Sequence, residues 1–382
     1  MGKIENNLQH LKLLFFVTED WYFCSHRLPL ALAAKEFGYE VSVVTNVNCH
    51  GEAIKRSGIK LIPLELSRRG INPLRELLLI YRLALIYRKE QPTIAHHVAL
   101  KPILYGSIAS WVAKVPFKVN AMAGLGFLFS SKTLKARAIR PFILFFFRFL
   151  LNLKGSRVIL QNPDDVDLLS TSGVLERERI VLIRGSGVDI EEFKVQPEPS
   201  GDLIVVLASR LLWDKGVGEF VEAARQLKQQ GVCARFVLVG EGDPENPTAI
   251  SRDQLRAWHE EGVVEWWGRR DDMATVLAKT HIVCLPSYRE GLPKVLLEAA
   301  ACGRPIVTTD TPGCREIVHD DLNGFLVPIR DANAVAAALK KLLASSKLRQ
   351  TMGMHGRELV EREFTLEKVN LQTLALYEKL IK

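Results

Sequence analysis

The segment HIVCLPSYREGLPKVLLEAAACGRPIVTTD (281–310) decides the fold. It opens with the apolar run HIVCLP (281–286) and closes with PIVTTD (305–310), and each run resembles a strand that is buried on both faces. Between them, residues 293–302 have apolar positions at helical spacing and begin at Pro293, a residue that suits the start of a helix. Strand, helix and strand within about 30 residues form a βαβ unit, whose two strands run parallel.

The same alternation extends in both directions along the chain. Further strands are predicted at 203–209, 235–240 and 264–268, and in the first half at 11–17, 41–45, 60–66, 93–97, 117–123, 157–161 and 180–184. Helices are predicted at 73–90, 102–113, 216–230 and 332–344. This pattern indicates doubly wound parallel sheets, and 382 residues suffice for two domains. We therefore expect an α/β enzyme whose two domains face a central cleft, since ligands of such sheets bind beyond the carboxyl ends of the strands.

The domain limits follow from composition. Residues 1–192 are predicted to form the N-terminal domain, and residues 193–202, which lie in a segment rich in proline and charge, the linker. The C-terminal domain is predicted to span 203–362, followed by an amphipathic helix at 363–382.

Positive charge is concentrated in the first half of the chain. The formal net charge is +8, but residues 1–195 hold 27 Lys and Arg against 17 Asp and Glu. Ten Lys and Arg residues, and no Asp or Glu, lie between Glu90 and Asp164. We expect a surface of this half to face an anionic partner: phosphate groups, acidic lipid or nucleic acid.

Within this basic region, ARAIRPFILFFFRFLLNLKGSR (136–157) combines aromatic and basic residues. Its apolar run is interrupted and falls short of the ~20 residues that a membrane span needs. We predict a helix lying on a membrane surface, with contacts from Arg140, Phe145, Phe146 and Arg148. The alternative is a core helix packed on the sheet. Nucleic acid is disfavoured because no RNA- or DNA-binding motif accompanies the charge.

Composition argues against several other classes of protein. The six cysteines are far apart and form neither a CxxC nor a Cys/His cluster, which disfavours a zinc site and indicates a reducing compartment. The segment MGKIENNLQH (1–10) lacks the apolar core of a secretory signal. GEGDPEN (240–246) follows a strand but lacks the third glycine of a dinucleotide-binding loop, which disfavours an NAD-dependent dehydrogenase.

Two carboxylates mark a candidate ligand site in the second half. Glu290 lies in the loop before the helix at 293–302, and Glu298 lies about one turn inside that helix. Gly291 allows close backbone approach, and the first turn of the helix can bind phosphate. A carboxylate so near an anion site is best explained by sugar hydroxyl groups.

Two cations stand at the end of the strand at 203–209. Arg210 follows this strand directly, and Lys215 follows five residues later at the start of a helix. A guanidinium and an ammonium at one strand end can hold a diphosphate. Solvated surface charge is the alternative.

The run S-x-x-E-G-x-P-x-x-x-x-E-A-x-A-x-G-x-P (287–305) resembles the signature of retaining glycosyltransferase family 4, whose GT-B fold has two Rossmann-like domains. WGRRDDM (267–273) and TDTPGCREIV (309–318) are similar to that family in the same order. The resemblance covers essentially the whole chain. It implies that the helix at 363–382 packs back on the N-terminal domain.

The resemblance also implies roles for individual residues. Glu298 would bind the ribose of the nucleotide, Glu290 the donor sugar, and Arg210 and Lys215 the diphosphate leaving group. The remaining donor-binding residues would be Gly268, Arg269, Arg270, Gly291, Leu292 and Gly313. The family retains anomeric configuration without a nucleophile at Glu290, and this chain has no DxD-type carboxylate pair for a metal. Asp271–Asp272 is interpreted as a helix N-cap.

The acceptor half resembles a subgroup that acts on lipid-linked sugars. TEDWYFCSHRLP (18–29) is predicted as a loop in place of the Gly-Gly loop found in many members. The acceptor-binding candidates are His26, Arg27, His96, Lys101, Gly124 and Gly126, and His97 is a catalytic candidate. Since neighbours on a strand alternate faces, only one of His96 and His97 is expected to face the cleft, and a core histidine is the alternative. For His26 and Arg27 the alternative is helix capping.

We therefore expect a retaining, metal-independent glycosyltransferase. It would move a hexose or N-acetylhexosamine from a nucleotide diphosphate sugar, UDP by default, to a polyprenyl-diphosphate-linked sugar in bacterial surface polysaccharide or glycan synthesis. The nucleotide sugar is a substrate, and no cofactor is expected. The expected location is cytoplasmic, peripheral on the inner face of the membrane. The alternatives are a UDP-sugar 2-epimerase on the same fold and a non-catalytic membrane-surface binding protein.

Overall fold

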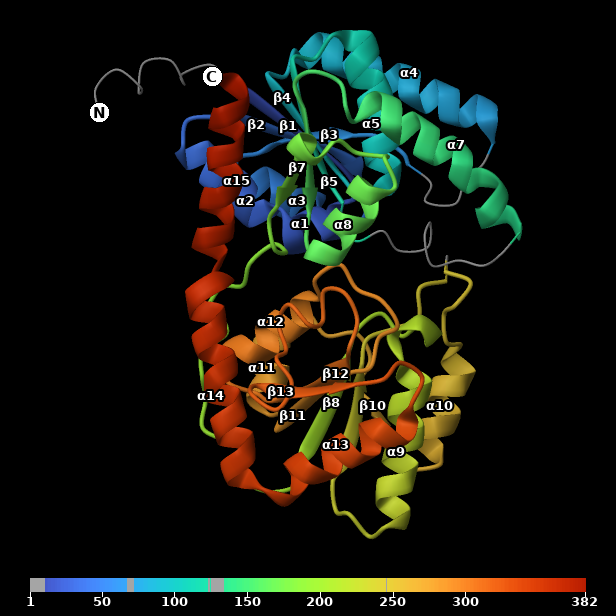
Figure 1. Ribbon diagram of the computed structural model, residues 1–382, viewed down its shortest axis with the longest axis vertical. Helices are drawn as coiled ribbons and strands as arrows, with labels where there is room; N and C mark the ends of the chain where they lie inside the picture. The colour runs from blue at the N-terminus through green and yellow to red at the C-terminus, as the bar shows by residue number, and fades with distance from the viewer. Residues whose placement is uncertain (1–10, 67–71, 123, 125–133, 245) are drawn as a thin grey trace. The chain divides into compact units, whose positions relative to one another are not determined.

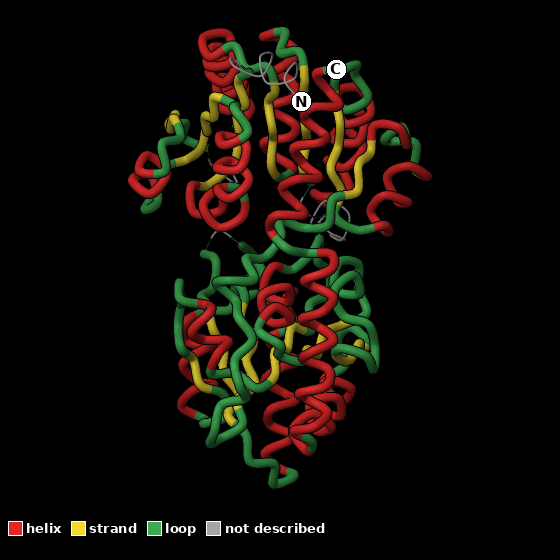
Figure 2. Tube along the Cα trace, turned by 90° about the vertical axis from the view of Figure 1, so that its left-hand side faces the viewer, coloured by secondary structure: helices red, strands yellow, loops and turns green. Residues whose placement is uncertain are grey.

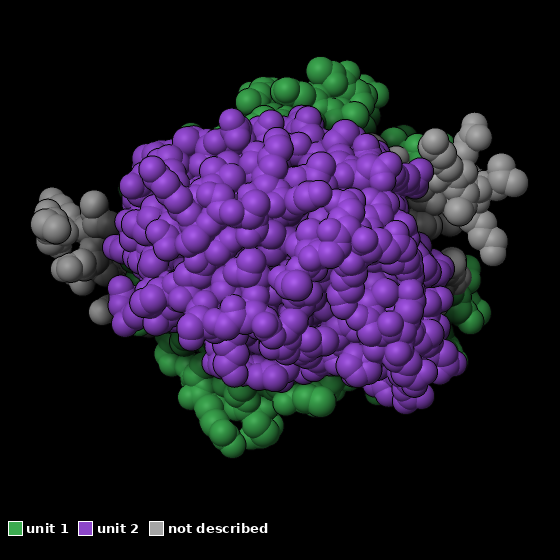
Figure 3. All heavy atoms as spheres, turned by 90° about the horizontal axis from the view of Figure 1, so that it is seen from below, with its two compact units in different colours: residues 1–186, 369–382 green, residues 187–368 purple. Residues whose placement is uncertain are grey.

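The computed structural model describes residues 11–66, 72–122, 124, 134–244 and 246–382, with only the backbone of 134–139. The chain divides into two compact units, coloured separately in Figure 3. Unit 1 comprises residues 1–186 and 369–382, and unit 2 comprises residues 187–368. In both units the strands are flanked by helices (Figure 2).

Unit 1 contains a parallel sheet of seven strands in the order β3-β2-β1-β4-β5-β6-β7. The strands are β1 (Lys12–Glu19), β2 (Glu40–Asn46), β3 (Lys60–Pro63), β4 (Ile94–Val98), β5 (Phe117–Ala121), β6 (Ser156–Leu160) and β7 (Ile180–Leu182). The helices are α1 (Asp20–His26), α2 (Leu28–Glu36), α3 (Gly51–Arg56), α4 (Pro73–Glu90), α5 (Leu100–Ala113), α7 (Leu134–Leu150) and α8 (Pro163–Thr171), with a 3₁₀ turn at Arg177–Arg179.

Helices cover both faces of this sheet (Figure 1). Along β1, Leu13 and Phe15 pack in a cluster with α1, α2 and α3, whereas Leu14 and Phe16 pack against α4 and α5. Because successive strand residues point to opposite faces, a central strand covered on both sides must be apolar throughout. That requirement explains the continuous apolar run at 11–17.

A distant segment completes the core of unit 1. Residues of α15 (Leu366–Ile381) enter the cluster formed by β1, α1 and α2. They are the apolar side chains Val369, Leu374, Leu376, Tyr377 and Leu380, all buried. The core of unit 1 is therefore built from two segments that are separated in sequence by the whole of unit 2.

Unit 2 contains a parallel sheet of six strands in the order β10-β9-β8-β11-β12-β13. The strands are β8 (Ile204–Ala208), β9 (Arg235–Val239), β10 (Glu265–Trp266), β11 (Ile282–Leu285), β12 (Ile306–Thr309) and β13 (Gly324–Val327). The helices are α9 (Val217–Gln229), α10 (Arg252–Glu260), α11 (Met273–Ala278), α12 (Lys294–Ala301), α13 (Ala332–Ala344) and α14 (Ser346–Glu363), and Trp213–Lys215 forms the 3₁₀ turn η3.

The strand order in each sheet reverses at one place. In unit 1 the chain winds outward from β1 in one direction and from β4 in the other, and in unit 2 from β8 and β11. The loops after these strands diverge to opposite faces of the sheet, which opens a crevice at the carboxyl ends of the strands. The candidate ligand-binding residues of unit 2 follow β8 and β11.

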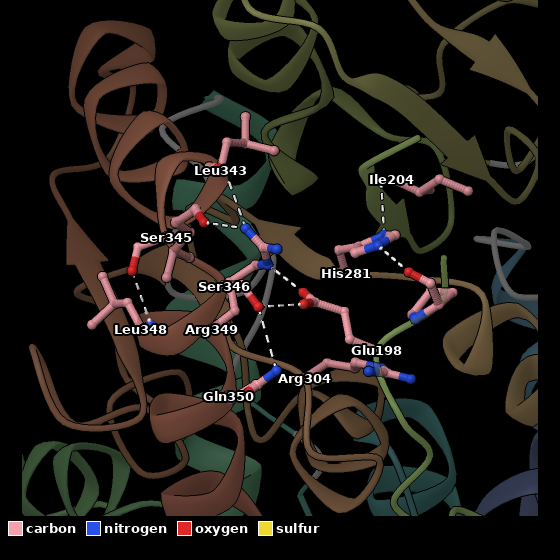
Figure 4. A network of polar contacts seen from close by, with 12 residues as sticks. Glu198, Ile204, His281, Arg304, Leu343, Ser345, Ser346, Leu348, Arg349 and Gln350 are labelled. Atoms are coloured by element: carbon pink, nitrogen blue, oxygen red, sulfur yellow. Dashed lines mark hydrogen bonds and ion pairs between the residues drawn. The ribbon is translucent and has the colours of Figure 1, made fainter. Parts of the chain in front are cut away.

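Every strand and helix predicted above is present in the structure. One prediction of detail was wrong. Residues 18–29 are not a loop, since Asp20–His26 form α1. Strand β13 was not predicted. Residues 193–202, predicted as the linker, belong to unit 2, where Glu198 pairs with Arg349 of α14 (Figure 4).

Candidate functional site

An ion pair joins the two sides of the crevice in unit 2. Lys215 ends the η3 turn after β8, and its Nζ lies 2.5 Å from Oε1 of Glu290, in the loop after β11. Both side chains are largely buried, at 19% and 10% exposure. The backbone oxygen of Asp214 accepts hydrogen bonds from the Tyr288 N–H and the Ser287 hydroxyl, at 2.9 and 3.2 Å. The two loops are therefore fixed to each other, and Lys215 has a defined position.

Gly216 makes this close approach possible. It has a φ of 71°, in the left-handed region, and a Cβ added there would lie 2.0 Å from the carbonyl oxygen of Pro286. Any side chain would push the Lys215 turn away from the end of β11.

Arg210 has a partner that the sequence analysis did not foresee. Its Nη1 lies 3.1 Å from Oδ2 of Asp243, and its side chain is about half exposed. Asp243 belongs to the segment 240–246, which lacks the third glycine of a dinucleotide-binding loop. Asp243 follows β9, which is the neighbour of β8 in the sheet, and this position could have identified it as a partner of Arg210.

The loop after β12 packs directly on the Glu290 loop. Gly313 has a φ of 82°, and a Cβ there would lie 2.3 Å from the carbonyl oxygen of Gly291. Cys314 is buried, and burial raises the pKa of its thiol to about 11, so it is an inert packing group. The structure thus brings Gly313 to Glu290 and Gly291, with Leu292 buried behind them.

Glu298 is a buried carboxylate on α12. It is 6% exposed, and Oε1 lies 3.2 Å from Nζ of Lys294, one helical turn earlier. Burial raises its pKa, and the ammonium of Lys294 opposes that shift. A carboxylate with so little solvent needs hydrogen-bond donors, which the hydroxyl groups of a ribose can supply.

The turn at 268–272 is exposed and rich in charge. Gly268 has a φ of 69°, and its carbonyl accepts a 2.8 Å hydrogen bond from the N–H of Gly240. Arg269 and Arg270 each pair with an aspartate two residues later, at 3.3 and 2.6 Å. Asp272 occupies the N-cap position of α11, but its side chain makes no capping hydrogen bond, because it is held by Arg270. Arg270 also lines a pocket of about 310 Å³ with Trp267, Thr275, Val276 and Lys279.

His96 and His97 are both buried in unit 1. Nδ1 of His97 lies 2.7 Å from Oδ1 of Asn120, and its Nε2 lies 3.1 Å from the hydroxyl of Tyr87. Burial lowers its pKa to about 4. A Cβ at Gly106 would lie 2.4 Å from the ring, so α5 closes over it. His97 is a core histidine and is withdrawn as a catalytic candidate.

The other acceptor candidates are each described by their contacts. His26 stacks on Tyr22 at 4.2 Å and contacts the Ser25 hydroxyl. Nζ of Lys101, at the start of α5, lies 3.0 Å from Oε1 of Glu76. Gly124 follows β5 with a φ of 108°, and Gly126 lies outside the described residues. Arg27 is the C-cap residue of α1, where its N–H donates to the Phe23 carbonyl at 2.8 Å, and the N-cap residue of α2, where its side chain makes no capping bond.

Helix α7 buries one face and exposes the other. Phe147 and Leu150 are buried, whereas Phe145 is 69% and Phe146 42% exposed. The exposed face also carries Phe142, Arg148 and Phe149, and Arg140 is partly exposed. Among the residues that the structure describes, no helix is long and apolar enough to span a bilayer.

Comparison with known proteins gives one consistent result. The family model for glycosyl transferase 4-like proteins matches residues 12–162, and the model for glycosyl transferases group 1 matches residues 202–345. The chain is 28% identical over 373 residues to the N,N'-diacetylbacillosaminyl-diphospho-undecaprenol alpha-1,3-N-acetylgalactosaminyltransferase of Campylobacter jejuni, covering 93% of this chain and 95% of that protein. It is 22% identical to the capsular polysaccharide biosynthesis glycosyltransferase CapM of Staphylococcus aureus, covering 94% and 96%.

Solved structures agree on the fold. The crystal structure of Anabaena HepE with UDP and glucose superposes with a TM-score of 0.79 at 19% identity, covering 97% of this chain and 100% of that one. Sucrose-phosphate synthase from Thermosynechococcus elongatus gives 0.78 at 21%, covering 97% and 99%. The fold is therefore GT-B. Because one family model matches within each unit and the likeness spans nearly the full length of the relatives, this chain belongs to the glycosyltransferases that pair a glycosyl transferase 4-like region with a group 1 region.

Proposed function

We propose that the protein is a retaining glycosyltransferase that transfers a hexose or N-acetylhexosamine from a UDP-sugar to a sugar on a polyprenyl diphosphate. The observation that carries the proposal is the fixed Lys215–Glu290 pair at the switch point of unit 2. It sets a cation and a sugar-binding carboxylate side by side. The Campylobacter relative, whose name specifies a diphospho-undecaprenol acceptor, supports the acceptor class.

In the proposed reaction, the bond between the sugar C1 and the β-phosphate oxygen breaks, and its electron pair goes to the phosphate. The acceptor hydroxyl forms a new bond to C1 on the same face and gives its proton to the departing phosphate oxygen. Lys215 and Arg210 stabilise the charge that grows on the diphosphate. Glu290 accepts hydrogen bonds from the donor sugar, and Glu298 from the ribose.

We propose that the reaction needs no metal ion. The charge that grows on the leaving diphosphate is matched by the cations Lys215 and Arg210. The nucleotide sugar is a substrate, so no cofactor is required.

The decisive experiment is donor-dependent labelling of a polyprenyl-diphosphate-linked sugar by purified protein in EDTA. A panel of UDP- and GDP-sugars is tested, with Glu298→Ala as the inactive control. Labelling with one donor, retained in EDTA and lost in the variant, supports donor, acceptor and metal independence together. Conversion of a UDP-sugar without any acceptor would instead favour the 2-epimerase.

We also propose that unit 1 binds the anionic inner face of the cytoplasmic membrane through α7. Helices α4, α5 and α7 lie side by side (Figure 1), and the rings of Trp111 on α5 and Phe149 on α7 are 6.5 Å apart. Exposed apolar residues of α4 and α5 include Leu74, Leu77, Leu78, Tyr81, Leu85, Trp111 and Val112. Arg75 and Arg82 on α4 and Arg148 on α7 are exposed as well. Apolar side chains mixed with cations complement an anionic bilayer surface.

Changing Phe145, Phe146 and Arg148 to Ser, Ser and Gln should release the protein from anionic vesicles. The substitution removes two exposed aromatic rings and one cation, each worth about 1 kcal/mol or more at a membrane surface. Co-sedimentation with phosphatidylglycerol vesicles measures the effect, and the expected loss is at least about tenfold in partitioning.

Leu371→Ser is the matched control, because Leu371 is an exposed apolar residue on α15, 53% accessible. It should leave vesicle binding unchanged. Undiminished co-sedimentation of the triple variant would contradict membrane contact through α7.

A further inference from the structure

Arg27 is a buried cation without a counter-charge. It is 6% exposed, and its Nε is inaccessible and has no hydrogen-bond partner. Among the described residues, no ion pair and no side-chain hydrogen bond involves its guanidinium. It stands between α1 and α2, in the segment that follows β1.

One further unpartnered polar atom lies within the influence of this charge. Nε2 of His96, on β4, is buried without a hydrogen-bond partner. The ring of His96 contacts that of Tyr377, and the two centroids are 5.8 Å apart. Nδ1 of His96 is bound to the Tyr377 hydroxyl, so its Nε2 faces away from Tyr377.

The charge of Arg27 acts on this group. Burial lowers the pKa of His96 well below its usual value, and the guanidinium of Arg27 lowers it further. His96 is therefore neutral at physiological pH. When its Nδ1 accepts the Tyr377 proton, Nε2 carries a hydrogen without an acceptor.

Buried polar groups without partners are unfavourable in the protein when no ligand is bound. A buried charge without a partner lowers the stability of the fold, and each unpaired donor adds to that loss. A methionine would fill the same volume without this cost. A buried cation and a neighbouring donor, both with no acceptor, are what an anion-binding site presents before its ligand arrives.

We propose that Arg27, with Nε2 of His96, binds the diphosphate of the lipid-linked acceptor. The assignment rests on the proposed function and names the group of the substrate that unit 1 holds. The N-terminal end of α2, which directly follows Arg27, adds favourable partial charge. The diphosphate of the donor already has Arg210 and Lys215 in unit 2, whereas these residues belong to unit 1.

Binding is tested first without catalysis. The melting temperature of the wild type, with UDP saturating the donor site, should rise when inorganic pyrophosphate is added. In Arg27→Met, the melting temperature without pyrophosphate should be equal to or above that of the wild type, and the response to pyrophosphate should be lost. A wild type that does not respond, or an Arg27→Met variant that responds equally, would overturn the proposal.

Kinetics then identify the source of the diphosphate. With a water-soluble, short-chain polyprenyl-diphosphate sugar and no vesicles, Arg27→Met should raise the acceptor KM about 10- to 100-fold, the loss expected for a charged hydrogen bond. The Kd for UDP should be unchanged, and Arg27→Lys should restore part of the acceptor affinity. A weakened Kd for UDP would assign Arg27 to the donor, and an unchanged acceptor KM would show that it does not bind acceptor.

The transfer assay and the Arg27→Met experiments distinguish between the role of Arg27 and the proposed function. If the wild type transfers no sugar to any lipid-linked acceptor, the proposed function fails, while the pyrophosphate response still reports on Arg27. If transfer occurs but Arg27→Met leaves both readouts unchanged, only the inference fails.

Discussion

Lys215→Met should lower kcat by about 10²- to 10³-fold, the loss typical of removing one preorganised group that stabilises transition-state charge. Nζ of Lys215 is held by Glu290 at 2.5 Å, so it does not have to reorganise when charge grows on the leaving diphosphate. Part of its interaction with the diphosphate already exists in the ground state. The donor KM should therefore rise by less than kcat falls.

Steady-state rates with varied donor at saturating acceptor measure the effect. Lys215→Arg keeps the charge but changes its reach, and should recover part of the rate. Lys347→Met is the matched control, since Lys347 is exposed on α14 of the same unit. A Lys215→Met enzyme with normal kcat would remove the ammonium from the proposed mechanism.

Arg349→Ala should destabilise unit 2 by about 3–5 kcal/mol, the cost of breaking a buried ion pair by removing one partner. The side chain of Arg349 is 6% exposed, and its guanidinium binds Glu198 (Figure 4). It also donates to the Leu342 carbonyl at 2.8 Å. Glu198 accepts a further hydrogen bond from the Ser346 hydroxyl at 2.9 Å. Removing the arginine leaves the Glu198 carboxylate without its counter-charge and takes one donor from each of the Leu342 and Leu343 carbonyls at the end of α13.

Urea unfolding monitored by tryptophan fluorescence checks this prediction. Lys347→Ala, two residues away and exposed, should change stability little. The double variant Glu198→Met with Arg349→Met should be less destabilised than the sum of the single changes, because no unpaired charge remains. Additive losses would indicate that the two residues do not form an energetic pair.

The stability that the Glu198–Arg349 pair contributes depends on pH. Burial alone would raise the pKa of Glu198, but hydrogen bonds from Arg349 and Ser346 outweigh it, so the pKa lies below its ordinary value of 4.5. A lowered folded-state pKa contributes stability that is present above the unfolded-state value and is lost as pH falls through the folded-state value. The difference between the wild type and Glu198→Gln should therefore shrink below about pH 4.5.

The fold could be predicted because strands covered on both faces leave a continuous apolar run, as in 11–17 and 281–286. Strand β13 was not predicted because it has only four residues, begins at Gly324 and follows a turn. So short a segment shows no periodic pattern of apolar residues. Helix α1 was predicted as a loop because its seven residues mix aromatic, acidic and hydroxyl side chains, and its helical form depends on packing of Phe23 against β1.

The site was predictable only where a motif fixes the backbone. The Glu290 loop, Glu298 and Lys215 lie as their spacing suggested, and Gly313 packs against Gly291. The burial of His97 could not be read from the sequence, because it depends on Tyr87, Asn120 and Gly106, which come from three other elements. Likewise, the burial of Arg27 without a partner depends on the packing of the folded unit, and no pattern in the neighbouring sequence indicates it.

The split construction of unit 1 has a consequence during protein synthesis. The ribosome makes residues 369–382 only after all of unit 2, yet they cover the apolar face formed by β1, α1 and α2. Until then the nascent first unit exposes that face and is a target for chaperones, while unit 2 has all of its own chain and can fold first. The Tyr377–His96 contact therefore forms late, so a chain cut short before α15 would lack it and would be open to proteolytic removal.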